Sequence, residues 1–252
     1  MAGIALITGA SSGIGRATAV ALARAGFSLV ITGRRQERLA ALAAELAPVP
    51  VHTLTFDVRD QAAVEAAIGS LPEEFQAIDV LINNAGNAHG QAPIEKGDPK
   101  DWDRMMDGNV KGLLYVTHAV LPGMTARQRG HIINIGSIAG HEVYANGNVY
   151  CASKAAVAAL SKAMRLDLLP YNIRVAEVNP GLVATEFSEV RFKGDTSRAA
   201  TVYQGYEPLR AEDIADLIQF MVTRPAHVNI AEVLILPAAQ ASATLVKKEP
   251  VS

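Results

Sequence analysis

Cysteine, aromatic residues and long apolar runs are all scarce in this chain of 252 residues. The single cysteine, Cys151, cannot form a disulfide within the chain, so the sequence predicts a protein of a reducing, cytoplasmic compartment. No stretch approaches the ~18 uninterrupted apolar residues of a membrane span. Glycines also interrupt the apolar N-terminus before the core of a secretion signal forms. We therefore expect a protein without a membrane partner.

Strong charge of either sign is also missing. The 23 lysines and arginines nearly balance the 25 aspartates and glutamates, which gives a formal net charge of −2 without a basic block. A nucleic-acid partner requires a concentrated basic surface, so none is expected. The six histidines show no pairing at metal-ligand spacing, and the sequence therefore predicts no metal site.

Short β-branched apolar runs alternate with stretches of helical spacing along most of the chain. Strands are expected at residues 4–7, 29–31, 51–56, 80–82, 132–135, 174–178 and 233–236. Helices are expected at residues 17–25, 38–46, 62–68, 149–169 and 211–222. This alternation is typical of βαβ units on a parallel sheet covered on both faces. The sequence predicts an α/β fold, a single-domain Rossmann-type doubly wound sheet of about seven parallel strands with helices on both faces.

No linker rich in proline, glycine or serine divides the chain, so one domain is expected over residues 1–245. Residues 180–207 fit neither the strand nor the helix pattern, because proline, glycine, threonine and charges alternate there. We expect this segment to be a mobile loop that forms a lid over the end of the sheet. Residues 246–252 are polar and are expected to be a frayed tail.

A glycine-rich segment joins the first predicted strand to the first helix. It runs from Thr8 to Gly15 and contains the spacing Gly-x-x-x-Gly-x-Gly. Glycines permit a tight turn close to a pyrophosphate, and the helix N-terminus supplies free N–H groups with partial positive charge. The alternative is a purely structural turn. The position of the segment between the first strand and the first helix of the βαβ series favours a nucleotide site instead. The residues of that site would be Gly9, Ala10, Ser11, Ser12, Gly13, Ile14 and Gly15.

Tyr150 and Lys154 are one helical turn apart and share a helix face. An unperturbed phenol, with a pKa near ~10, exchanges protons poorly at neutral pH, and an adjacent ammonium lowers that pKa. Tyr150 can then act as a general acid or base. Ser137, at the carboxyl end of another strand, can hydrogen-bond the substrate oxygen. The alternative is an ordinary amphipathic pair and a serine that merely hydrogen-bonds at a strand end.

Two arginines, Arg34 and Arg35, follow the second predicted strand. A carboxylate at this place would bind the adenosine ribose 2′-hydroxyl and select NAD, whereas arginine pairs with a 2′-phosphate. Two arginines and no acid therefore predict NADP as cofactor. The alternative is that both are solvated charges at the start of the next helix.

These motifs, in this order, resemble those of the short-chain dehydrogenase/reductase family. The family motif Thr-Gly-x-x-x-Gly-x-Gly matches Thr8 to Gly15 in full. Further family marks are Asp57-Val58, Asn83-Asn84-Ala85-Gly86, Asn109, Ser137, Tyr150-x-x-x-Lys154 and Pro180-Gly181. The resemblance covers nearly the whole chain. It implies hydride transfer by the nicotinamide, a catalytic set of Asn109, Ser137, Tyr150 and Lys154 in which Asn109 holds a relay water, and a homotetramer.

The resemblance also implies further contacts to the dinucleotide. These would come from Asp57, Val58, Asn84, Ala85, Gly86, Tyr150, Lys154, Pro180, Gly181, Val183 and Thr185. Asp57 would accept from the adenine amine, although an aspartate after a strand is also a common helix N-cap. Lys154 would bind the nicotinamide ribose, and Thr185 would hold the nicotinamide carboxamide.

Four segments narrow the resemblance to the NADP-dependent 3-hydroxy acid dehydrogenases, a subgroup that includes serine and allo-threonine dehydrogenases. They are residues 32–38, 131–137, 186–195 and 225–230. The implied substrates are short 3-hydroxy acids of the serine, allo-threonine, 3-hydroxypropionate or 3-hydroxyisobutyrate type, contacted by Ser137 and Tyr150. Arg191 is the candidate partner of the substrate carboxylate, because its planar fork binds both oxygens; the alternative is a solvated lid charge.

Two departures from the subgroup and two other functions stay open at this point. The chain lacks one glycine after Val183, and Glu142 would oppose an anionic substrate if it lay near the pocket. One alternative function is an NADPH-dependent reductase of uncharged ketones or aldehydes. The other is a cofactor-binding regulator without turnover, against which the complete catalytic set argues.

Overall fold

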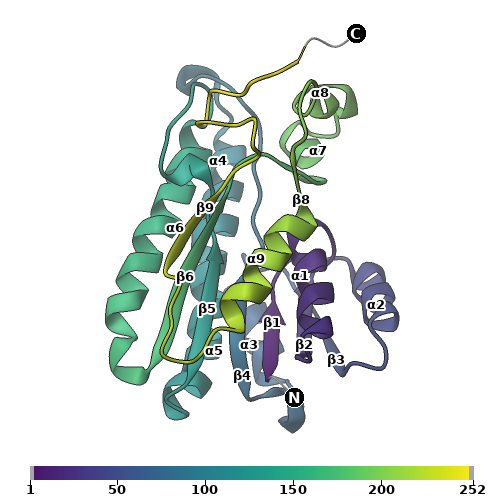
Figure 1. Cartoon of the computed structure of the whole chain (residues 1–252), viewed down its shortest axis with the longest axis vertical. Helices are drawn as coiled ribbons and strands as arrows, with labels where there is room; N and C mark the ends of the chain where they lie inside the picture. Colours follow the sequence, from purple (N-terminus) through teal and green to yellow (C-terminus); the bar gives the residue numbers. More distant parts are fainter. Residues whose placement is uncertain (1–2, 250–252) are drawn as a thin grey trace.

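Seven parallel strands form the central sheet of the computed structural model, which describes residues 3–249 (Figure 1). They are β1 (Ile4–Ile7), β2 (Ser28–Gly33), β3 (Val51–Thr55), β4 (Ile78–Asn83), β5 (Gly130–Ile135), β6 (Ile173–Pro180) and β9 (Glu232–Ile235). Their order in space is β3-β2-β1-β4-β5-β6-β9, so the direction of winding reverses next to β1. All seven predicted strands are present, and the predicted Rossmann-type α/β fold is confirmed.

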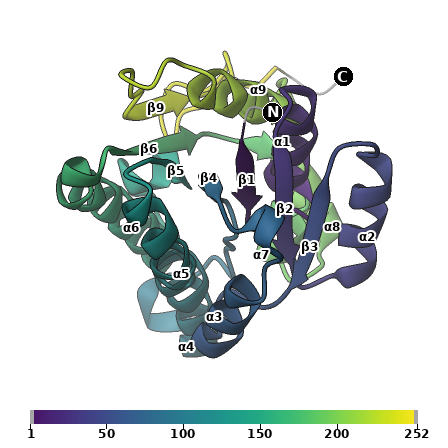
Figure 2. The same ribbon diagram turned by 90° about the horizontal axis from the view of Figure 1, so that it is seen from below.

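Helices cover both faces of this sheet (Figure 2). One face carries α1 (Gly13–Arg24), α2 (Gln36–Glu45) and α9 (Ala211–Val222), and the other carries α3 (Gln61–Gly69), α5 (Gly112–Ala126) and α6 (Asn148–Asp167). Strand residues alternate between the two resulting cores: Ile7 belongs to the first and Leu6 to the second. Burial on both faces explains why the strands are continuous apolar runs. Within residues 3–249, no helix combines the length and the apolar composition needed to cross a membrane.

Three successive helical segments between β4 and β5 were not predicted. They are α4 (Pro99–Met106), the π-helical turn η3 (Asp107–Lys111) and α5. Pro122 lies inside α5, and glycine and β-branched residues lower the helix propensity of this region further. Burial of Val116 and Val120 against the sheet stabilises α5 nevertheless.

The lid segment is more ordered than the sequence predicts. Residues 180–207 contain β7 (Val183–Ala184), α7 (Phe187–Arg191) and α8 (Thr196–Thr201), and β7 pairs with β8 (Leu209–Arg210). The segment expected to be a loop therefore contains three short regular elements. Its elements have two to six residues, which is too short for a periodic pattern to show in the sequence. Figure 1 shows α7 and α8 above the carboxyl ends of the strands.

The predicted tail contacts the fold as far as the structure describes it. The N–H of Lys247 donates to the carbonyl of Ala239, and that of Glu249 donates to the carbonyl of Gly205 beyond α8. Residues 250–252 of the predicted tail lie outside the described residues. Short helical turns complete the described chain: η1 (Glu73–Phe75), η2 (Ile94–Lys96), η4 (Ile138–Gly140) and η5 (Leu169–Tyr171).

A row of buried polar side chains crosses the apolar core beneath α5 and α6. Asn83 on β4 donates to Thr117 Oγ1 of α5 and to Asn134 Oδ1 of β5, at 2.9 Å in both cases. Asn134 donates in turn to Ser161 Oγ of α6 at 2.9 Å. Asn83 and Asn134 are register partners in the sheet, so the row joins two helices through two adjacent strands.

Candidate active site

The carboxyl ends of the central strands open into one cavity of about 340 Å³. It is lined by most of the predicted site residues: Gly9, Ser11, Ser12, Gly13, Ile14, Arg34, Arg35, Asp57, Val58, Asn84, Ala85, Gly86, Ser137, Tyr150, Lys154, Pro180, Gly181, Val183 and Thr185. The other two residues of the glycine-rich loop, Ala10 and Gly15, are buried within it. Segments that are far apart in the sequence therefore meet at one place, as expected where winding reverses in a parallel sheet.

The glycine-rich loop requires glycine for its shape. Gly9 has a φ of +67°, in the left-handed region. A Cβ on Gly15 would collide with Asn84 Nδ2 and with the carbonyl oxygen of Gly9. Asn84 itself donates to the carbonyl of Thr8 at 2.8 Å and so holds the loop against the end of β4.

The first turn of α1 is available to an anion. Ser12 is the N-cap residue, but its side chain makes no capping hydrogen bond. Its Oγ instead accepts from Arg35 Nη2 at 2.7 Å, and Ser11 Oγ accepts from the same nitrogen at 3.0 Å. The first N–H groups of α1 thus keep their donor capacity, and a guanidinium lies next to them.

Basic residues surround the end of the cavity near β2 and β3. Arg35 also forms an ion pair with Glu186 of the lid at 3.0 Å, and Arg34 lies 3.8 Å from Asp57 with its side chain 70% exposed. Arg59, which sequence analysis did not select, donates to Asp57 at 2.6 Å and lowers the pKa of that carboxyl. The N-cap of α3 is Asp60, so the alternative that Asp57 is a helix cap is wrong.

At the opposite end of the cavity, α6 presents Tyr150 and Lys154, and the end of β5 presents Ser137. All three side chains are buried, each at 9% exposure or less. The Lys154 ammonium donates to the carbonyl of Ile135 at 2.8 Å. The backbone N–H of Ser137 is fixed by Asn179 Oδ1 at 3.0 Å, which orients the serine at the start of η4. These residues meet as the sequence predicts.

Burial controls the acid–base properties of this pair. It raises the pKa of Tyr150 above its ordinary value, and the Tyr144 ring adds to the rise, whereas Ser137 and Arg191 oppose it. The expected lowering of the Tyr150 pKa by Lys154 is therefore not found in this structure, because removal from water outweighs the nearby charges. Burial also lowers the pKa of Lys154 to about 8, and Glu177 opposes that shift.

Asn109 lies in the π-helical turn η3, and its side chain is fully engaged. Oδ1 accepts from the Asn87 N–H at 2.7 Å, and Nδ2 donates to the Asn87 carbonyl at 2.9 Å and to Ser153 Oγ at 3.0 Å. It thereby ties the loop after β4 to α6, next to Tyr150. A π-helical turn is often found at functional sites, because it redirects side chains that a regular helix would turn away.

Arg191 projects from lid helix α7 towards Tyr150. Its Cζ lies 5.5 Å from the ring centroids of both Tyr144 and Tyr150, and Nη2 donates to the Tyr144 hydroxyl at 2.8 Å. Its Nε is buried and has no hydrogen-bond partner. Lys193, the next cation of the lid, is by contrast paired with Asp101 at 2.8 Å. Arg191 is not among the residues that line the cavity, but its buried Nε is an unused donor on a guanidinium that lies close to the Tyr150 ring.

Glu142 does not oppose an anion at this place. Its carboxylate is exposed and accepts from the N–H of Ala243 at 2.8 Å, away from the cavity lining. Other lining residues were missed by sequence analysis: Gly33, Phe56, Arg59, Asn87, Gly108, Ile135, Gly136, Glu186, Phe187 and Val190. Several of them are sequence neighbours of predicted residues at strand ends, and this adjacency was a signal that could have identified them.

These features fit a phosphorylated dinucleotide. The uncapped N-terminus of α1 suits a pyrophosphate, the arginines near β2 and β3 suit a further phosphate, and Tyr150 with Lys154 suits a nicotinamide ribose and the reacting carbon. Both ends belong to one continuous cavity, which allows a single dinucleotide to occupy both.

Comparison with known proteins agrees with this geometry. Residues 3–195 match the short chain dehydrogenase family model. The chain is 49% identical over 243 residues to an NADP-dependent 3-hydroxy acid dehydrogenase of Salmonella typhi, covering 96% of this chain and 98% of the relative. It is 47% identical to sulfoacetaldehyde reductase 2 of Chromohalobacter salexigens, covering 96% of each chain.

Solved structures show the same relationship. A closed form of serine dehydrogenase complexed with NADP+ superimposes with a TM-score of 0.93 at 46% sequence identity, covering 98% of this chain and 100% of that one. A levodione reductase superimposes with a TM-score of 0.85 at 30% identity, covering 94% of this chain and 96% of the other. On the match over residues 3–195 and on these relatives, the chain belongs to the short-chain dehydrogenase family.

Proposed function

We propose that this enzyme is an NADP-dependent oxidoreductase that interconverts the β-hydroxyl and β-carbonyl groups of short 3-hydroxy acids. The observation that carries the substrate assignment is the guanidinium of Arg191, which faces Tyr150 with an unpartnered Nε. An arginine in this position can bind a carboxylate through two parallel hydrogen bonds. The 3-hydroxy acid relative at 49% identity and the NADP+ complex at 46% identity support the assignment.

The bound cofactor supplies hydride transfer. The residues of the chain supply binding and proton transfer. Tyr150 is protonated over the neutral range, because burial raises its pKa, and so it can give a proton to a carbonyl oxygen. In the reverse direction, its phenolate form accepts the proton of the substrate hydroxyl. Ser137 stabilises charge on the same oxygen, Lys154 binds the ribose, and Asn109 positions the loop after β4 against α6.

The names of the relatives share one chemical feature. A 3-hydroxy acid has its reacting carbon separated from a carboxylate by one carbon, and sulfoacetaldehyde has its reacting carbon separated from a sulfonate by one carbon. An arginine fixed close to the Tyr150 ring selects substrates with this separation between the reacting carbon and the anion. Serine, allo-threonine, 3-hydroxypropionate and 3-hydroxyisobutyrate all satisfy it.

Arg191→Ala tests the substrate charge. We expect the variant to lose roughly tenfold or more in kcat/KM for 3-hydroxy acids, which corresponds to ~1.4 kcal/mol or more. The methyl esters should react nearly as before, because they carry no charge for the guanidinium. The measurement is NADP reduction by matched acids and esters.

Lys193→Ala provides the matched control, since it removes a lid cation that is already paired with Asp101. It should leave the ratio of acid to ester unchanged. Equal losses on acid and ester in Arg191→Ala would reduce Arg191 to a lid-shaping residue. A wild type that prefers the ester would favour a reductase of uncharged carbonyls, and absence of turnover on the whole panel would favour a regulator.

Cofactor preference gives a second test. The wild type should prefer NADP over NAD in kcat/KM by roughly tenfold to more than a hundredfold, because each charge-assisted contact to the extra phosphate contributes ~1.5–3 kcal/mol. Replacing Arg34 and Arg35 by alanine should lower activity with NADP much more than activity with NAD. Arg38→Ala is the control, since Arg38 is a neighbouring cation that pairs with the same Glu186 but does not line the cavity. Equal kcat/KM with the two cofactors in the wild type would refute the assignment.

The proposal also includes the oligomeric state and the cellular location. The homotetramer remains a prediction from the family resemblance and from the small residues of α6 after Tyr150, among them Ala155 and Ala159. The lone cysteine, Cys151, is a buried free thiol, which supports the predicted reducing, cytoplasmic location.

A further inference from the structure

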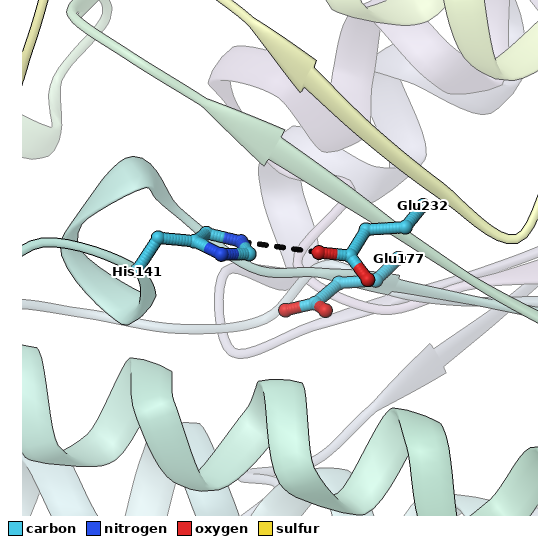
Figure 3. A group of neighbouring side chains, drawn as sticks. All are labelled: His141, Glu177 and Glu232. Carbon is cyan, nitrogen blue, oxygen red and sulfur yellow. Dashed lines mark ion pairs between the residues drawn. The ribbon is translucent and has the colours of Figure 1, made fainter.

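Three side chains with metal-ligating atoms meet outside the cavity, between β6 and β9 (Figure 3). His141 follows the turn η4, Glu177 lies on β6, and Glu232 lies on β9. One ligand atom from each residue lies within 4.8 Å of the other two. Glu177 and Glu232 are register partners on adjacent parallel strands, so their side chains share one face of the sheet.

Glu177 is the buried member of this group. Its side chain has no solvent exposure, and neither carboxylate oxygen has a hydrogen-bond partner of normal geometry among the described residues. Burial raises the pKa of Glu177, and the neighbouring Asn179, His141 and Lys154 oppose that shift only in part. A buried carboxylate without a partner is costly unless an ion or a donor compensates it.

The other two members open the group to solvent. His141 Nε2 lies 3.6 Å from Glu232 Oε1, and the side chains are 30% and 35% exposed. Figure 3 shows the imidazole facing the Glu232 carboxylate, with the carboxylate of Glu177 beside them. Lys162 approaches the other oxygen, Oε2 of Glu232, at 3.9 Å from the exposed surface of α6. Oε1 is thus the oxygen directed towards the imidazole.

We propose that His141, Glu177 and Glu232 form a Zn²⁺ site. One imidazole nitrogen and two carboxylate oxygens are ligands that Zn²⁺ accepts, whereas Ca²⁺ and Mg²⁺ prefer oxygen alone. Ligand bonds to Zn²⁺ are ~2.0–2.2 Å long, so the ligand atoms must approach one another, and the partly exposed His141 and Glu232 can turn to do so. Water completes the coordination from the solvent side.

This site lies next to the catalytic region without forming part of it. His141 comes directly after η4, whose N-cap residue is Ser137, and the two glutamates belong to the sheet. Zn²⁺ therefore ties the turn after the catalytic serine to two strands, as a structural clamp. Spacing along the sequence could not predict it, because each ligand comes from a different element.

The test is titration of the chelator-treated enzyme with Zn²⁺ by calorimetry, with the melting temperature measured in parallel. The wild type should bind one Zn²⁺ per chain with a Kd of about 10 μM or tighter. It should also melt at a higher temperature with Zn²⁺, because the ion binds only the folded site. His141→Ala and Glu177→Gln should each weaken binding at least tenfold and lose the thermal shift.

Two controls separate this site from other zinc-binding groups. His227→Ala and Glu142→Gln remove a histidine and a neighbouring carboxylate outside the group, and they should bind Zn²⁺ like the wild type. Co²⁺ should give a visible spectrum without a thiolate charge-transfer band, since Cys151 is not a ligand. A wild-type Kd above about 1 mM, equal affinity in His141→Ala, or a thiolate band would each overturn the proposal. Circular dichroism verifies that the variants are folded.

Discussion

Tyr150→Phe should lose nearly all turnover and keep its affinity for NADPH. The change removes one hydroxyl and little volume, so the packing against Phe187, whose ring centroid is 5.7 Å away, stays in place. Positioned acid–base groups contribute ~10²–10⁴-fold to rates, and we expect kcat/KM to fall by roughly a thousandfold or more. The measurements are NADPH oxidation with saturating carbonyl substrate, and NADPH binding by fluorescence.

Tyr171→Phe is the matched control, because Tyr171 is 40% exposed in η5, outside the cavity lining. Its kinetics should equal those of the wild type. Substantial turnover in Tyr150→Phe would remove the tyrosine from its role. A large loss of NADPH affinity would instead assign Tyr150 to cofactor binding alone.

Lys154→Met should impair both turnover and cofactor binding. The buried ammonium donates to the carbonyl of Ile135 and provides a positive charge beside Tyr150 in the cavity, where we expect the nicotinamide ribose. Methionine keeps the length of the side chain and removes the charge and its donors. We expect kcat/KM to fall by roughly a hundredfold or more, and the Kd for NADPH to rise at least tenfold.

The pH dependence separates charge from packing in this experiment. Burial lowers the pKa of Lys154 to about 8, so the ammonium is present below that pH and is lost as the pH rises through it. Wild-type affinity for NADPH should therefore decrease above pH about 8, and the affinity of Lys154→Met should not follow that curve. Lys162→Met, an exposed lysine on the same helix, should behave like the wild type. Identical pH curves for wild type and Lys154→Met would contradict the assignment.

The sheet and the residues at its strand ends were predictable because their signals are local. Buried parallel strands are apolar on both faces, and Thr8 to Gly15 combine a strand, a tight turn and a helix start within a few residues. Tyr150 and Lys154 fix their mutual distance by helix geometry alone. The convergence of Ser137 on them follows from parallel strands ending at one edge.

Other parts of the site depend on contacts between distant segments. The ion pair of Arg35 with Glu186 joins the first third of the chain to the lid, and no local pattern predicts it. Pro122 lowers the helix propensity of α5, so the sequence pattern did not predict this helix. Burial against the sheet stabilises α5 in the fold and overrides that propensity. The Tyr150 pKa was predicted with the wrong sign, because the sequence shows the neighbouring lysine and does not show the extent of burial.

The polar row through Asn83 and Asn134 restricts how the two central strands can pair. Strands β4 and β5 are both short apolar runs, and their hydrophobicity alone would accept several alignments. A slip by one residue turns an amide to the opposite face, away from Thr117 or Ser161, and each buried polar group left without its partner costs about 1–3 kcal/mol. Only the native alignment satisfies all these donors together. A few polar side chains in an otherwise apolar core thus select one register of β4 and β5 over alternative registers that hydrophobicity alone would allow.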